Sequence, residues 1–287
     1  KGHKTRKMID LSIKKILDID LEKQEAEAKS FTDLNSYFGG TGLGLRLLEM
    51  YSDKNPIIIS VGPLNGFFPF TSKTSMVLID EGAVEDIYLG GSLSTRIKFA
   101  GLDSIVIHGV AKEKTVIEIQ NSAAFLREES TDVWSLGLPG KRTIMEFDGK
   151  KVISDQYFTT PENYLEKKFI EKNIKGISIT GTEIYSPKNF DDYENLYEEI
   201  LSRKNELGVE PGGYPSCSGC PMGCGKSKIG EIGGNILLNS LVACQYADKI
   251  YTDIGTVFSC LNSLGYGYTH EDIENLPALV EKTIRKI

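Results

Sequence analysis

The sequence predicts an α+β protein in two parts, a strand-rich part over residues 1–186 and a helical part over residues 187–287. The first part contains short β-branched runs such as 57–61, which are typical of buried strands. The second part contains longer segments, for example 191–206, in which apolar residues recur at helical spacing. Two Gly-Gly turns punctuate the strand-rich part.

The strand-rich part is a succession of short apolar segments. Residues 57–61 predict a strand covered on both faces, whereas the alternating residues 115–119 predict a half-exposed strand. Thr160 and Pro161 predict the start of a helix that runs to about Glu171. Further strands are expected at 8–11, 16–19, 75–79, 104–109, 150–154 and 176–181.

The two Gly-Gly turns have the same pattern. Tyr37-Phe-Gly-Gly-Thr41 and Tyr88-Leu-Gly-Gly-Ser92 each precede an apolar helix, and an apolar strand follows each helix. We interpret this as an internal duplication of a strand–helix–strands unit. The simpler alternative is that a Gly-Gly pair before a helix is a common local feature.

The helical part is expected to contain four helices, at 191–206, 236–247, 253–264 and 271–287. Cys244 and Cys260 lie in two of these apolar segments and are expected to be small core residues. His108 lies in an apolar strand and is expected to be a hydrogen-bonded core residue, and Trp134 is expected to serve packing.

Composition restricts the classes of function. The chain has 287 residues, 40% of them hydrophobic and 25% charged, as in an ordinary globular protein. Its formal net charge of -7 and the lack of a basic run argue against nucleic-acid binding. No apolar run predicts a membrane span or a signal peptide, and the basic start at 1–7 carries no weight. Five cysteines, three of them in one loop, favour a reducing cytoplasm.

The loop Cys217-Ser-Gly-Cys220-Pro-Met-Gly-Cys224 is the strongest chemical signal. Closely spaced thiolates suit an iron–sulfur cluster or zinc. The cluster is favoured because zinc sites with this spacing usually have a second Cys or His pair, which this sequence lacks. A plain reduced loop is the third alternative. A fourth ligand would have to come from Cys244, Cys260, a non-cysteine group or another chain.

Several motifs, in this order, resemble the amino-terminal part of the tungsten-containing aldehyde ferredoxin oxidoreductases. They are Tyr37-Phe-Gly-Gly-Thr-Gly-Leu-Gly44, Val61-Gly-Pro-Leu-Asn-Gly66, Leu89-Gly-Gly91, Lys98-Phe-Ala-Gly-Leu-Asp103, Ile105-Val-Ile-His-Gly109 and the cysteine loop. The resemblance implies a domain of duplicated β-α-β(4) units, which forms a saddle under a metal held by two pterin dithiolenes beside a [4Fe-4S] cluster.

The resemblance also implies roles for individual residues. Cys217, Cys220 and Cys224 match the clustered cysteine ligands. Lys73 lies where the family has an arginine that touches the pterin. The other implied cofactor-binding residues are Leu89, Gly90 and Gly91 at the magnesium-bridged phosphates, and Asp248 and Asp253 at the pterin. Glu231 is a candidate catalytic acid.

The sequence also departs from the family pattern. Residues 161–169 stand where the arginine- and glycine-rich pterin loop is expected, so charge-assisted hydrogen bonds to one phosphate set are missing. Lys73 keeps the charge of the arginine but not its bidentate geometry. No Glu-Tyr-Glu motif follows the cysteines, and the last helical domain, which supplies the fourth cysteine in the family, is expected to be missing.

These observations support a leading function and two alternatives. The resemblance implies oxidation of an aldehyde to a carboxylic acid by a tungstopterin enzyme, with electrons passed through the cluster to ferredoxin or another carrier. The first alternative is a non-catalytic or electron-transfer subunit of the same fold that has lost the tungstopterin. The second is a zinc-stabilised binding module. Either of the first two functions could involve a second chain that supplies the missing domain, or a homo-oligomer.

Overall fold

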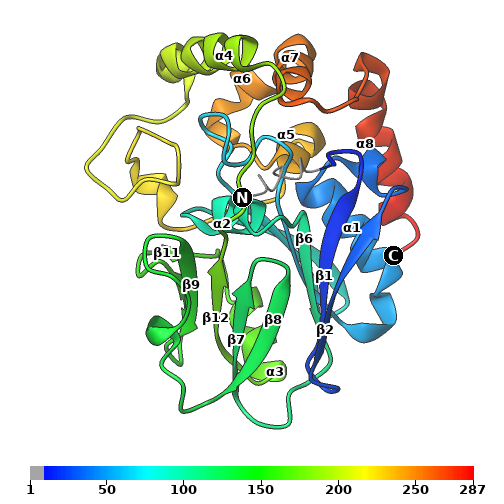
Figure 1. Cartoon of the computed structure of the whole chain (residues 1–287), viewed down its shortest axis with the longest axis vertical. Coiled ribbons are helices and arrows are strands. Elements are labelled where there is room, and N and C mark those ends of the chain that lie inside the picture. Colours follow the sequence, from blue (N-terminus) through cyan, green and yellow to red (C-terminus); the bar gives the residue numbers. More distant parts are fainter. Residues whose placement is uncertain (1–9) are drawn as a thin grey trace, which may run out of the picture.

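The computed structural model describes residues 10–287. Strands occupy the lower half of the molecule, and helices gather above and beside them (Figure 1). The strands form two mixed sheets, and the later part of the chain is largely helical, so the predicted α+β class is confirmed. Part of the strand predicted at 8–11 lies outside the described residues, and Asp10 and Leu11 belong to no strand.

The first sheet is built around β1 (Lys14–Asp20) and β6 (Ser104–His108), which run parallel. At one edge, β2 (Glu25–Phe31) pairs antiparallel with β1, and on the other side β3 (Ile57–Ser60) pairs antiparallel with β6. Beyond β3 follow, in order, β4 (Thr74–Asp80), β5 (Ala83–Leu89) and β13 (Glu231–Ile232). Because β13 comes from beyond residue 187, the two predicted parts share this sheet.

The second sheet is built around β7 (Thr115–Gln120) and β12 (Ile174–Thr180), which are again parallel. Here β8 (Ala123–Glu128) pairs antiparallel with β7, and β9 (Arg142–Phe147) pairs antiparallel with β12. Beyond β9 follow β10 (Val152–Ser154) and β11 (Phe158–Thr159).

Apart from β13, which has no counterpart among the described residues, the strands of the two sheets therefore follow the same order and run in the same relative directions. The two Gly-Gly turns do not occupy equivalent places in them, however. They lead into α1 (Gly40–Met50) and α2 (Leu93–Phe99), and the strands that follow these helices are β3 and β6, neighbours in the first sheet. In chain order, the counterpart of α2 is α3 (Tyr164–Glu171), which precedes β12. The glycine pattern thus located the repeat incorrectly.

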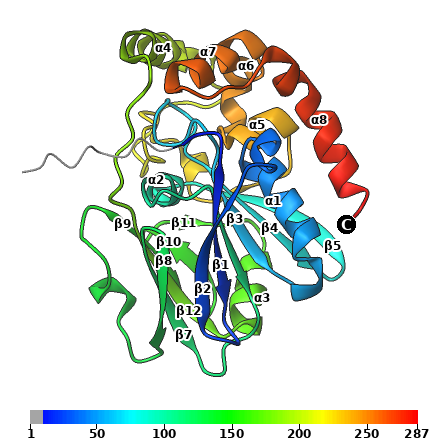
Figure 2. The same cartoon turned by 45° about the vertical axis from the view of Figure 1, so that its right-hand side comes forward.

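The helical part begins with α4 (Phe190–Ser202). It continues with α5 (Ile236–Leu241), α6 (Asp248–Tyr251), α7 (Ile254–Leu264) and α8 (His270–Ile284). Short 3-10 turns occur at Asn35–Tyr37, Ser52–Lys54, Val133–Ser135, Arg203–Glu206, Gly225–Ser227 and Gln245–Ala247. In the turned view, α1 lies between the first sheet and α8 (Figure 2). It is in contact with both.

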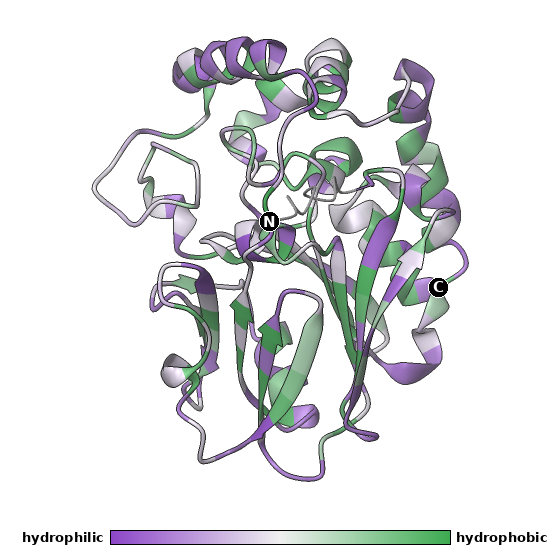
Figure 3. Cartoon of the chain, in the orientation of Figure 1, coloured by the Kyte–Doolittle hydropathy of each residue, from purple (hydrophilic) through white to green (hydrophobic). Residues whose placement is uncertain are grey.

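The core consists of two large apolar clusters, one on each face of the first sheet. One cluster joins the outer face to α1 and the helical part, and includes Ile58 and Leu241. The other lies between the two sheets around α2 and α3, and includes Ile59 and Ile177. All four residues of β3 are buried, which confirms the strand predicted at 57–61 as covered on both faces. In Figure 3 the inner strands β7 and β12 are largely hydrophobic, and α4 is largely hydrophilic.

Four local predictions were wrong. The edge strand β2 was missed because its residues are mostly exposed and polar. Strand β7 is buried and not half-exposed, because Arg127 covers the carboxylate of Glu118 with hydrogen bonds of 2.6 and 2.8 Å. Helix α3 starts after Asn163, and Thr160 caps nothing. The helix predicted at 236–247 ends at Leu241, where the next residue turns left-handed.

Within residues 10–287, no helix combines the length and the apolar character needed to cross a bilayer.

Candidate metal centre

The cysteine loop follows an irregular path that its glycines allow. Gly219 and Gly223 have φ angles of +73° and +52°, a region that favours glycine. The Cys220 N–H donates to the Cys217 carbonyl at 3.0 Å, which closes a tight turn between the first two cysteines. The tight turn and the two left-handed glycines therefore give this loop the path on which all three cysteines line one cavity.

The loop is attached to the Gly90–Gly91 turn at the end of β5. The Ser218 N–H donates to the Gly91 carbonyl at 2.9 Å. A Cβ atom on Gly90 would lie only 2.6 Å from the Sγ of Cys217. Gly90 and Gly91, predicted to bind a cofactor, thus lie beside the first cysteine, and Gly90 leaves the space that the Cys217 thiol uses.

Four of the five cysteines line one cavity. Cys217, Cys220 and Cys224 from the loop face it together with Cys244, which follows α5. The other residues that line it include Phe70, Lys73, Ser216, Lys226, Ser227 and Glu231. The free space is about 20 Å³, which suits one water molecule, so a larger occupant would require the glycine-rich loop to move outward.

The buried cation of this cavity is Lys73. Its Nζ lies 2.9 Å from the Oε1 of Glu231, and the two side chains are only 3% and 8% exposed. Burial lowers the pKa of Lys73, but the charges of Glu231, Cys217 and Cys244 outweigh it and raise that pKa overall. Lys73 is therefore an ammonium at neutral pH. Despite the short contact, Glu231 Oε1 has no hydrogen bond of good geometry within residues 10–287.

Two of the thiols, those of Cys220 and Cys244, are held protonated by their surroundings. Burial raises the pKa of Cys220 to about 11 and that of Cys244 to about 12. The neighbouring thiols raise the pKa of Cys220 further. Binding of a metal at these residues would therefore release protons.

A second buried network lies next to this ion pair. Tyr88 pairs with Glu231 across β5 and β13. The carboxylate of Asp86 accepts hydrogen bonds from the hydroxyls of Thr41 at 2.8 Å, Ser75 at 3.2 Å and Tyr88. Burial nevertheless raises the pKa of Asp86 to about 6. The sequence analysis missed this network because its members come from separate elements.

Asp248 and Asp253 lie elsewhere, at helix starts. Asp253 caps α7 by accepting the Thr256 N–H at 2.7 Å, and Asp248 accepts the Lys249 N–H at 2.8 Å at the start of α6. Neither lines the cysteine cavity. Their predicted contact with a pterin remains a prediction.

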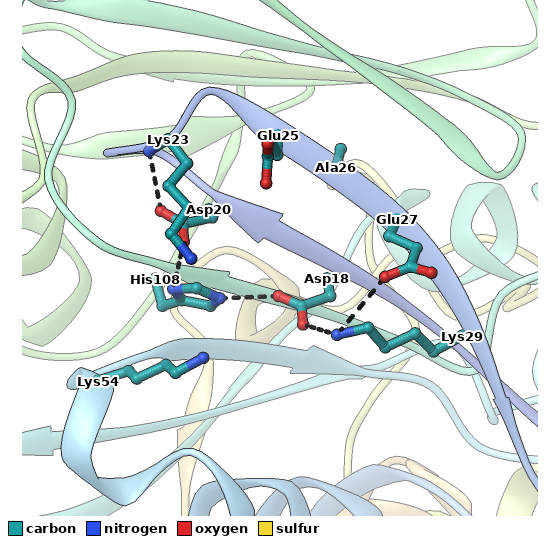
Figure 4. Close-up of a pocket in the computed structure, with 9 residues that line it drawn as sticks. All are labelled: Asp18, Asp20, Lys23, Glu25, Ala26, Glu27, Lys29, Lys54 and His108. Atoms are coloured by element: carbon teal, nitrogen blue, oxygen red, sulfur yellow. Dashed lines mark hydrogen bonds and ion pairs between the residues drawn. The ribbon is translucent and has the colours of Figure 1, made fainter.

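His108 is a hydrogen-bonded core residue, as predicted. Its Nε2 lies 2.8 Å from Asp18 Oδ1, and Asp18 accepts a hydrogen bond from Lys29 at 2.5 Å (Figure 4). Asp18 also accepts a hydrogen bond from Tyr51 at 2.7 Å. A charged pocket between β1, β2 and β6 opens beside these residues. Because most of its acids pair with neighbouring bases, it offers no free ligand set comparable to the cysteine cavity.

Within residues 10–287, no three histidine, cysteine or acidic side chains already stand in positions that would hold a single metal ion. The thiols line a common cavity without meeting at one point.

Comparison with known proteins identifies the first part of the chain. Residues 16–152 match the family model "Aldehyde ferredoxin oxidoreductase, N-terminal domain". These residues, just under half of the chain, are similar to that domain. The predicted resemblance is confirmed for this domain, and the homology to whole enzymes is distant. The cysteine loop lies beyond the matched residues.

Two proteins similar to this chain come from Pyrococcus furiosus. The "Aliphatic sulfonate oxidoreductase, WOR-like subunit" is 30% identical over 138 residues, which are 43% of this chain and 22% of that protein. A tungsten-containing aldehyde ferredoxin oxidoreductase is 22% identical over 231 residues, 69% of this chain and 37% of that protein. The chain thus covers between about a fifth and two fifths of these relatives.

A solved structure has a similar fold. It is described as the active site complex BamBC of benzoyl coenzyme A reductase in complex with 1,5-dienoyl-CoA, and it superposes with a TM-score of 0.58. The match covers 75% of this chain and 38% of that one at 16% identity, so it concerns the fold alone.

Proposed function

We propose that this chain is an electron-transfer component of the aldehyde ferredoxin oxidoreductase family, with one [4Fe-4S] cluster in the cysteine cavity. The observation that supports this is that Cys217, Cys220 and Cys224 line one cavity with the buried ammonium of Lys73. Such a cluster, when bound, takes up and passes on single electrons. The chain supplies the thiolates, and Lys73 offsets part of their negative charge.

The Gly90–Gly91 turn argues against a pterin phosphate at this position. Ser92 directly precedes α2. Its N–H and its hydroxyl donate to Asp155 Oδ2 at 3.0 and 2.6 Å. A Cβ on Gly91 would lie 2.8 Å from the ring of Phe158. The turn is therefore filled by the chain's own carboxylate and phenyl ring, and a phosphate there would be repelled. These residues therefore do not fit a magnesium-bridged pterin phosphate.

Aldehyde oxidation by a bound tungstopterin is the second candidate. Its support is the family domain at residues 16–152 and the place of Lys73 beside the cysteines. In this second candidate function, the cofactor would be approached by Leu89, Gly90, Gly91, Asp248 and Asp253. Glu231, the candidate catalytic acid, is buried against Lys73, an arrangement that fits a structural ion pair better than a proton donor.

A reducing cytoplasm and a protein partner fit the leading proposal. One relative is described as a subunit and the structure with the similar fold as a two-protein complex. Beside the cavity, Lys226 and Lys228 are exposed together with Ile229 and Tyr214, which are 62% and 57% exposed. This mixed basic and apolar surface suits an acidic electron carrier such as a ferredoxin, or a second chain.

Elemental analysis after anaerobic purification tests the proposal. We expect about four iron atoms and four sulfides per chain, with no tungsten, molybdenum or zinc. Tungsten or molybdenum near one per chain would establish the second candidate instead. Zinc without iron would support the zinc-stabilised binding module. Folded, colourless protein free of iron after reconstitution would refute the leading proposal.

A further inference from the structure

We infer that Cys244 is the fourth ligand of the cluster, so that this chain closes the cluster without a cysteine from another chain. The inference rests on the proposed function, because it presupposes the cluster at Cys217, Cys220 and Cys224. The primary observation is that Cys244 lines the same cavity as those three thiols and approaches it from the helical part.

The four thiols line the cavity from two apolar clusters. Cys220, Cys224 and Cys244 pack against the apolar cluster of the helical part, whereas Cys217 packs against the cluster between the sheets. The cavity thus lies where the two cores meet. A four-iron cluster needs ligands that approach from separate directions, which a single loop of eight residues does not supply by itself.

The backbone presents Cys244 to the cavity by leaving the helix early. Val242 adopts a left-handed conformation, with φ of +52° and ψ of +39°, and ends α5. The Cys244 N–H then donates to the carbonyl of Phe70 at 2.8 Å, and the Lys73 N–H donates to the Val242 carbonyl at 3.2 Å. Cys244 is therefore fixed to the same segment that carries Lys73.

One polar group of the cavity suits an anionic occupant. Lys73 is a buried ammonium with a single carboxylate partner, Glu231. A cluster with four thiolate ligands carries net negative charge, and the Lys73 ammonium would stabilise it at short range.

The other candidates for the fourth ligand are less suited. Cys260 is fully buried on α7 and does not line the cavity. Glu231 is engaged by Lys73. Ser216 and Ser227 line the cavity, but hydroxyl oxygens are poorer ligands for iron–sulfur clusters than thiolates.

The test compares Cys244→Ala with Cys260→Ala and Cys217→Ala in the full chain, each reconstituted anaerobically with iron and sulfide. We expect the Cys260→Ala variant to match the wild type in iron content and in its EPR spectrum after reduction. Cys244→Ala should lose about one iron in four and show the EPR signal of an oxidised three-iron cluster, or lose the cluster. Circular dichroism verifies that each variant is folded, and Cys244→Ser serves as a second variant of matched size.

The outcomes separate this inference from the proposed function. If Cys217→Ala loses the cluster while Cys244→Ala and Cys244→Ser keep four irons and an unchanged spectrum, the cluster stands and Cys244 is not its ligand. If the wild type itself takes up no iron, the proposed function fails first.

Discussion

The Sγ of Cys217 occupies the space in which Gly90 would carry a Cβ, at a distance of 2.6 Å. A Cβ on Gly90 would also lie 3.3 Å from the ring of Phe158 and 3.3 Å from the carbonyl oxygen of Ser227. The Gly90 turn, Phe158 and the cysteine loop are distant in sequence, and they pack together where residue 90 lacks a side chain. The first cysteine can face the cavity only because residue 90 has no side chain.

Gly90→Ala should displace Cys217 and weaken cluster binding. The added methyl group overpacks this contact, which typically costs about 1–3 kcal/mol of the free energy of unfolding. We expect a clear loss of iron per chain after reconstitution, together with a lower midpoint of urea unfolding.

The matched control is Gly213→Ala, in the same loop, where an added Cβ meets nothing within 4 Å. It should retain the iron content of the wild type. Equal iron content in both variants would show that the Cys217 thiol does not depend on Gly90.

Lys73→Met should strongly destabilise the chain by leaving Glu231 buried without its cation. Removal of one partner of a buried ion pair costs about 3–5 kcal/mol, and urea unfolding of the cluster-free protein measures it. The double variant Lys73→Met with Glu231→Gln should recover much of this loss, because no unpaired charge is left.

In cluster-loaded protein, the loss of this positive charge should also lower the reduction potential, measured by EPR-monitored titration. Lys73→Arg keeps the charge and should leave the potential near that of the wild type. A Lys73→Met variant with unchanged stability and potential would contradict the role given to this ion pair.

The sequence predicted the chemistry of this region better than its geometry. The spacing of the three loop cysteines predicted that they share one site, because that signal is local, and all three line one cavity. A metal bound there stays a prediction. Strand β13 could not be predicted, since Glu231 gains its strand only by pairing with Tyr88, which is far away in the chain. The Asp86 network was missed for the same reason.

Cys244 shows a different limit of sequence analysis. Its surroundings are apolar and fit a helix, so the prediction of a helix through 247 followed from the pattern. The helix ends because Val242 turns left-handed, a conformation that a β-branched residue rarely adopts. Tertiary contacts determine it, among them the hydrogen bond from Lys73 to the Val242 carbonyl. The repeat was placed wrongly because it was inferred from the two Gly-Gly turns. Their glycines allow close packing, and a sequence pattern does not distinguish glycines that allow close packing from glycines that mark equivalent places in a repeat.

Asp86 should give the folding stability a distinctive pH dependence. Its pKa is about 6 in the folded chain and near 3.8 when unfolded, so between these values the folded state holds the extra proton. This contribution stabilises the fold at the acid end of the window and is lost as the pH rises through about 6. Its full size is about 3 kcal/mol, at roughly 1.4 kcal/mol per pKa unit.

Urea unfolding of the cluster-free wild type and of Asp86→Asn at pH 5 and pH 8 tests this. The asparagine cannot ionise, so the gain in stability from pH 8 to pH 5 should be larger for the wild type than for the variant. Comparing the two proteins removes the effect of other acids such as Asp18, whose pKa is lowered and whose contribution has the opposite sign. An identical difference in both proteins would show that Asp86 does not titrate in this window.

Cluster loading should stabilise the whole chain, and most of all the segment between residues 212 and 228. Without a cluster, this loop is held by few backbone hydrogen bonds, such as Ser218 to Gly91 and Tyr214 to Gly223. A ligand that binds only the folded chain raises its stability by mass action, and a cluster bound through several thiolates should raise the unfolding temperature by several degrees or more. Hydrogen exchange should show the largest gain in protection in the cysteine loop and around Cys244, with little change in the second sheet. If protection rose in the loop but not around Cys244, the cluster would be held by the three loop cysteines, with its fourth ligand from elsewhere.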